Sequence, residues 1–237
     1  MGLKMETLPP SYIGRTAASI IEERSHFDSI GCLYRAMSWL DLFERSNAWP
    51  ALLYSCTEGR YGIEYLLFEE LVVGAGANLS RDDYERCVRE PTKLAKAINR
   101  LLPDYEKLQQ FTSVIVSLAP QQLPPIIYWQ PKELMKTWRE LSKYLHWCGH
   151  RLETAENTEW KKIALSYVKG VLTPIWNKVT SGQSACMHPD QMHAEIRELW
   201  VEFKEGRVDA DGTRIRINLL KPLLELKYVQ QVAAGVA

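Results

Sequence analysis

The chain has 237 residues, of which 46% are hydrophobic and 24% are charged, which is the composition of a folded globular protein with a substantial core. Lysine plus arginine and aspartate plus glutamate both number 29, so the chain lacks the overall positive charge of a protein that binds nucleic acid in bulk. Any site for an anion must therefore come from a local cluster of cations.

The cysteines and the apolar segments indicate a cytoplasmic protein. The five cysteines are an odd number and widely spaced, which argues against a disulfide framework and favours a reducing compartment. The first residues contain no apolar core of a signal peptide. The longest apolar run, over 65–79, holds two glutamates and is too short to span a bilayer, so we expect no membrane segment.

Apolar residues recur at helical spacing along most of the chain, which predicts a mainly α fold. Within it we expect a helical bundle over residues 15–180 and a C-terminal appendage of helix and β-hairpin over 181–237. The predicted helices span 15–46, 49–74, 81–89, 91–102, 104–118, 131–155, 158–180 and 189–205, with further helix after 219.

Two connecting segments carry alternatives. The apolar, proline-rich loop 119–131 either packs over the bundle or meets a partner, and packing is favoured. Near the C-terminus, the alternation in 207–219 and the Asp211–Gly212 pair predict a β-hairpin with Arg214 and Arg216 on one face. These arginines either contact phosphate or protect an exposed edge strand from aggregation, and the second interpretation is favoured.

The predicted helix over 131–155 has two distinct faces. Its apolar face is complete, within an arc of about 80°; the residues of this face are Leu134, Trp138, Leu141, Leu145, Cys148 and Leu152. Arg139, Lys143, His146 and His150 follow at i, i+4, i+7 and i+11 and form a separate cationic stripe.

The cationic stripe has a structural and a functional interpretation. It is either a solvated basic face or an interface with an acidic helix, or it is a site for phosphate. Like charges four residues apart destabilise a helix slightly, so the cationic stripe does not stabilise its own helix. Histidine can move a proton near neutral pH and arginine presents a fork that fits phosphate oxygens, which favours the functional interpretation.

The segment WRELSKYLH, in which Arg139 precedes His146 by seven positions, resembles the R-x4-6-H motif of the HEPN superfamily of helical RNA-cleaving toxins and antiviral effectors. The earlier segment 57–71 is similar to the IE-x-LL helix of that bundle, and the resemblance covers about residues 15 to 155. Glu140 stands directly after Arg139, where the family usually has Asn, Asp or His.

The resemblance implies metal-independent RNA cleavage that leaves a 2′,3′-cyclic phosphate, with no cofactor. His146 would be the general base, Arg139 would stabilise the phosphorane, and Glu64 would orient one of the two. Lys143, His150 and Arg60 would contact the RNA backbone. Such proteins commonly form homodimers in which two motifs face each other, and some bind an antitoxin. Arg60 and Glu64 have the alternative of pairing with each other as i, i+4 neighbours on one helix.

Two other classes compete with the nuclease. One is a non-catalytic helical module of the same architecture that dimerises or holds a partner protein. The other is a zinc site, because 186–193 is rich in cysteine and histidine. The ligand spacing is poor for zinc, since no pair of cysteines is separated by two residues, and we expect no metal.

Overall fold

The computed structural model describes residues 11–23, 28–76, 79–90, 93–118, 128–147, 157–182 and 189–233, without the side chains of 146, 147, 191 and 224–233. Within these ranges the regular secondary structure is all helical, which confirms the predicted mainly α class. The elements are α1 (Ala17–Ile21), α2 (Ser29–Ser46), α3 (Trp49–Ala75), α4 (Arg81–Arg89), α5 (Leu94–Leu101), α6 (Tyr105–Ser117), α7 (Pro131–Trp147), α9 (Thr158–Thr180), the 3-10 turn η4 (Pro189–Gln191), α10 (Ala194–Lys204) and α11 (Ala210–Ala233).

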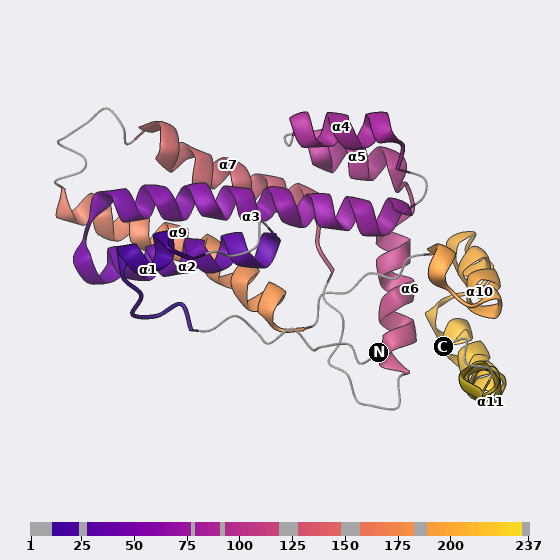
Figure 1. Cartoon of the computed structure of the whole chain (residues 1–237). Helices are drawn as coiled ribbons and strands as arrows, with labels where there is room; N and C mark the ends of the chain where they lie inside the picture. The colour runs from indigo at the N-terminus through magenta and orange to yellow at the C-terminus, as the bar shows by residue number, and fades with distance from the viewer. Residues whose placement is uncertain are drawn as a thin grey trace.

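The 27-residue helix α3 is the centre of the bundle. It packs mainly on α2 and α7, and α9 packs on α2 (Figure 1). Gly62 allows a close approach of α3 to α2: a Cβ atom built on it would lie 2.7 Å from Cγ of the fully buried Leu33 on α2. A side chain at position 62 would therefore push these two helices apart.

The chain enters and leaves α2 through residues suited to helix ends. The Asp28 carboxylate accepts a hydrogen bond from the Gly31 backbone N–H at 2.6 Å, so it caps the first turn. Asn47 follows the helix with a φ of 56°, a left-handed conformation that asparagine tolerates better than most residues. Pro50 then stands in the first turn of α3, where its missing N–H costs no hydrogen bond.

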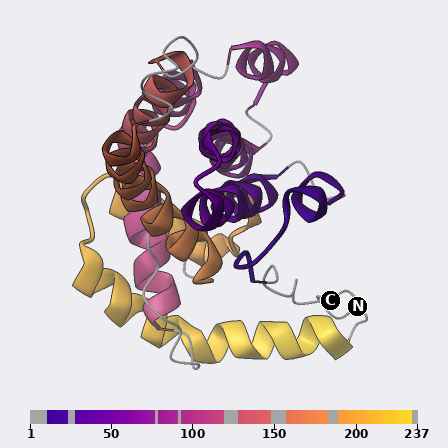
Figure 2. The ribbon, with the colours of Figure 1, turned by 90° about the vertical axis from the view of Figure 1, so that its left-hand side faces the viewer.

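The buried apolar residues form two clusters. The larger one joins α2, α3, α5, α7 and α9 around residues such as Leu33, Leu67 and Leu172. The smaller one joins α6, α10 and α11, with Phe111 of α6 packed against Trp200 of α10 at a ring separation of 5.5 Å. These three helices gather beyond the C-terminal end of α3 (Figures 1 and 2). The proposed division near residue 180 stays a prediction, although the second cluster also draws on α6.

The C-terminal hairpin prediction was wrong, because residues 210–219 lie within α11. Asp209 starts this helix: its carboxylate accepts from the Gly212 N–H at 2.8 Å, and its carbonyl accepts the Thr213 N–H at 2.9 Å. Thr213 and Ile217, one turn apart, are the buried positions. The alternation of Thr213, Ile215 and Ile217 that suggested a strand is therefore carried on a helix, and Ile215 is exposed.

Two predicted helices are divided in the structure. The predicted helix over 15–46 is broken into α1 and α2, and the one over 189–205 into η4 and α10. In the loop 119–131, residues 119–127 lie outside the described ranges, but Trp129 is buried against the bundle, with Lys178 Nζ 3.9 Å from its ring centre. Among the described helices, none is long and apolar enough to cross a membrane.

Candidate functional site

Helix α7 carries Arg139 and Lys143 of the predicted cationic stripe, and its core face is as expected in the described part. Pro131 opens the helix, and Leu134 and Leu141 are buried in the larger cluster. Trp138 and Leu145 are partly buried against it. Cys148 and Leu152 lie outside the described residues, so the apolar face is tested only up to residue 145.

The opposite face of α7 carries four exposed cations, Lys132, Lys136, Arg139 and Lys143, which we call the α7 basic row. Their spacing of i, i+4, i+7 and i+11 places them on one side of the helix over a length of about 16 Å. No side chain in the described ranges forms an ion pair with Arg139. The row is therefore an open basic surface rather than a buried network.

Lys143 is the member of this row whose charge is offset. Its Nζ lies 2.7 Å from a carboxylate oxygen of Glu140, which also accepts a hydrogen bond from the Tyr167 hydroxyl of α9 at 2.6 Å. The hydrogen bonds from Lys143 and Tyr167 lower the pKa of Glu140. Burial and the same carboxylate raise the pKa of Tyr167 to about 12. Glu140 thus links α7 to α9 and removes one unit of positive charge from the row.

Within the described residues, Glu64 forms no ion pair with Arg139, one of the two residues that the resemblance expected it to orient, and an orienting role toward His146 stays a prediction. The Glu64 Oε1 accepts a hydrogen bond from the Trp138 indole Nε1 at 2.7 Å. Arg139, the next residue on α7, is exposed on another side of that helix. The Glu64 carboxylate therefore links α3 to α7 through Trp138, the residue directly before Arg139.

Arg60 also engages Trp138 and does not form the expected pair with Glu64. Its guanidinium carbon lies 4.2 Å from the centre of a Trp138 ring, a cation–π contact. Its Nε is buried and has no hydrogen-bond partner among the described atoms. Arg60 and Glu64 thus hold the two sides of one tryptophan, and Arg60 lies between helices instead of on an open surface for RNA.

The side chains of the two predicted histidines lie outside the described residues. The backbone of His146 belongs to α7, but its side chain lies outside what is described, and His150 lies outside altogether. The structure thus brings Arg60 and Glu64 together through Trp138, and places Arg139 and Lys143 on the open face. The pairing of Arg139 with His146 stays a prediction.

Sequence reasoning missed part of this arrangement. Lys132 and Lys136 precede Arg139 and Lys143 by seven residues, so the same spacing extends the stripe toward the start of α7. That signal was present in the sequence. The polar contacts of Trp138 were not, because its spacing within the helix marked it only as a core residue.

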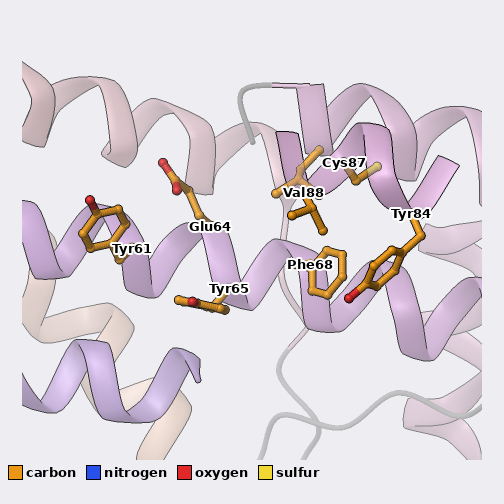
Figure 3. Close-up of a pocket in the computed structure, with 8 residues that line it drawn as sticks. Tyr61, Glu64, Tyr65, Phe68, Tyr84, Cys87 and Val88 are labelled. Carbon is orange, nitrogen blue, oxygen red and sulfur yellow. The ribbon is translucent and has the colours of Figure 1, made fainter. Parts of the chain in front are cut away.

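A pocket of about 330 Å³ lies between α3, α4 and α5. Tyr61, Glu64, Tyr65 and Phe68 line it from α3, and Tyr84 faces Phe68 from α4 (Figure 3). The rings of Phe68 and Tyr84 meet edge to face at 5.3 Å. The sequence spacing of the α3 residues at i, i+3, i+4 and i+7 indicated a shared face, but nothing in it pointed to α4 as the other wall.

No group of three or more potential metal ligands occurs among the residues that the structure describes. Cys186 and His188, from the segment considered for zinc, fall outside them. Cys32, Cys56 and Cys87 are buried. Comparison with protein-family models, with curated proteins and with solved structures finds no match to this chain.

Proposed function

We propose that this protein binds RNA along the α7 basic row and cleaves it without a metal, as a HEPN-like endoribonuclease. The observation that supports this most is the open row itself: Lys132, Lys136 and Arg139 lie along one exposed helix face. Successive cations on such a face are about 4.5 to 6 Å apart along the helix axis, which suits contacts with neighbouring phosphates. His146 continues the same seven-residue spacing after Arg139.

In the proposed reaction, His146 removes the proton of a ribose 2′-hydroxyl, whose oxygen attacks the adjacent phosphorus. Arg139 stabilises the added negative charge on the phosphorane. The bond to the 5′-oxygen of the next nucleotide breaks, a second acid protonates that oxygen, and a 2′,3′-cyclic phosphate remains. The His146 of a second copy is the proposed acid, so the proposal includes a homodimer with two α7 helices facing each other.

The other predicted residues take altered roles in this proposal. Lys143 and His150 attract the RNA backbone, with the charge of Lys143 reduced by Glu140. Glu64 and Arg60 position α7 through Trp138 and do not touch the RNA. The proposed setting is a cytoplasmic toxin or antiviral effector, with an antitoxin as its possible protein partner.

The experiment measures binding and cleavage of a labelled structured RNA separately. Arg139→Ala and Lys136→Ala are expected to weaken binding and each to reduce the slope of log affinity against log salt by about 1. Lys162→Ala is the matched control, because Lys162 is an exposed lysine on α9, outside the row. Binding that is equal in all variants, or absent in the wild type, would overturn the RNA-binding proposal.

Cleavage is assayed in the presence of EDTA, with the product ends identified by their 2′,3′-cyclic phosphate. His146→Ala is expected to abolish cleavage while retaining much of the binding, since it removes the base but leaves Lys132, Lys136 and Arg139 in place. Cleavage that requires a divalent metal, or that survives His146→Ala, contradicts the mechanism.

A second candidate is a non-catalytic helical module that dimerises or holds a protein partner. The contacts of Trp138 favour it, because they commit Arg60 and Glu64 to packing between α3 and α7. This candidate predicts no cleavage product from wild-type protein, even where RNA binds tightly. The same assay therefore distinguishes the two.

A further inference from the structure

The pocket between α3, α4 and α5 is a separate feature from the α7 basic row. None of its lining residues belongs to α7. Its volume of about 330 Å³ lies at the small end of the range of about 300 to 1,000 Å³ that is usual for small-molecule sites. It is therefore large enough for a compact ligand or for one side chain of a peptide.

Aromatic rings dominate the walls of this pocket. Tyr61, Tyr65 and Phe68 project from successive turns of α3, and Tyr84 completes the wall from α4 (Figure 3). Tyr61 and Tyr84 are 51% and 46% exposed, so their rings are accessible to a ligand from solvent. Each aromatic face carries a partial negative charge and attracts a cation that comes within about 6 Å of the ring centre.

Glu64 makes this aromatic pocket anionic. It lines the pocket while Oε1 is fixed by the Trp138 indole, a neutral donor that leaves the carboxylate charge in place. Within the described chain, Glu64 forms no ion pair. Burial raises the pKa of Tyr65 and of Cys87, so the phenol and the thiol stay neutral at pH 7. Glu64 is thus the charged group among the residues that line the pocket.

Four aromatic side chains and one carboxylate line the pocket, and Figure 3 shows the Glu64 carboxylate to one side of Phe68 and Tyr84. Ring faces and a carboxylate attract the same charge, and apolar walls favour methyl groups over bound water, so this lining suits an organic cation. From this arrangement we infer that the pocket binds an alkylated ammonium group, with Glu64 as its counter-ion and Tyr61, Tyr65, Phe68 and Tyr84 as its walls. A simple metal cation is a poor fit, because one carboxylate supplies too few oxygen ligands.

The test is titration calorimetry of the full chain with choline and with its neutral isostere 3,3-dimethyl-1-butanol. The two probes have nearly the same shape and differ in charge, so their ratio of affinities isolates the electrostatic part of binding. Choline is expected to bind at least about tenfold more tightly than the isostere, the factor that a partly desolvated cation–π and carboxylate site supplies.

Two variants locate the binding. Glu64→Gln keeps an oxygen that can accept from Trp138 but removes the charge, so it is expected to reduce choline affinity toward that of the isostere. Tyr61→Ala is expected to weaken choline binding about threefold to tenfold. Tyr54→Ala is its matched control, since Tyr54 lies on the same helix, is 52% exposed and does not line this pocket.

Each alternative outcome refutes the inference. Equal affinity of the two probes would make the pocket a merely apolar cavity. Choline binding that Glu64→Gln leaves unchanged, or that Tyr54→Ala weakens as much as Tyr61→Ala, would place the ligand elsewhere. No heat of binding for choline up to millimolar concentration would leave the pocket without the proposed ligand class. None of these outcomes bears on cleavage by His146, so this inference and the proposed function fail separately.

Discussion

The contact between Trp138 and Glu64 allows a quantitative test of how α7 is attached to α3. Trp138→Phe removes the indole N–H and retains an aromatic ring for Arg60 to stack on. The hydrogen bond is 2.7 Å long and its acceptor is a carboxylate, so it belongs to the stronger class of side-chain hydrogen bonds. Glu64 is only half-buried, and water can replace part of the loss.

These considerations give an expected coupling free energy of about 1 to 2 kcal/mol between the two side chains. It is measured in a double-mutant cycle of Trp138→Phe and Glu64→Ala, from urea unfolding followed by far-UV circular dichroism. The cycle cancels the packing cost of replacing indole by phenyl, because that cost occurs with and without Glu64. The reference cycle combines Glu64→Ala with Arg139→Ala, for which the expected coupling is near zero.

The reasoning fails if the Trp138 and Glu64 substitutions are additive within about 0.3 kcal/mol. It also fails if the Arg139 cycle gives the larger coupling, since Glu64 would then orient the arginine as the family resemblance implied. Measurement of both cycles under one set of conditions therefore decides whether Glu64 links α3 to α7 through Trp138 or orients Arg139, as the family resemblance implied.

Three further predictions follow from the buried residues of the bundle. Gly62→Ala is expected to be less stable than Gly170→Ala by about 1 to 3 kcal/mol in urea unfolding, because a Cβ at 62 meets Leu33 while at 170 it meets no atom within 4 Å; equal effects would contradict the tight α2–α3 contact. Burial raises the pKa of Glu70, so the folded state holds the Glu70 proton more tightly than the unfolded state does. The free energy of unfolding should therefore fall as the pH rises from 4.5 through the raised pKa. Glu70→Gln should flatten this slope, and an unchanged slope would assign the slope to another group. Burial also raises the pKa of Cys32 to about 12, so its thiol should react with a thiol reagent at pH 8 only when the protein unfolds, and fast labelling of the folded protein would be the contrary result.

The helical class and most helix ends could be predicted from the sequence because they depend on local chemistry. Ser80 caps α4 by accepting from the Asp83 N–H at 3.1 Å, a contact between residues three positions apart that a serine before a helix commonly makes. Gly206 has the left-handed φ of 75° expected where a helix stops. The wrong hairpin prediction at 207–219 has a local cause as well, because a short run of alternating apolar residues fits a strand. In the structure, the Asp209 cap and the burial of Thr213 and Ile217, one helical turn apart, belong to α11.

In the candidate site, too, some features follow from the local sequence and others from the packing of helices. The sequence by itself determined which residues share the outer face of α7, because helical periodicity places Arg139 and Lys143 together whatever the helix packs against. Only the tertiary structure decided what Glu64 and Arg60 contact, since their partner Trp138 lies 74 residues away from Glu64 in the chain and on another helix. The aromatic pocket arose in the same way, from the packing of α4 beside α3. Periodicity sets the direction of a side chain from its own helix axis, whereas its partner depends on how the helices pack.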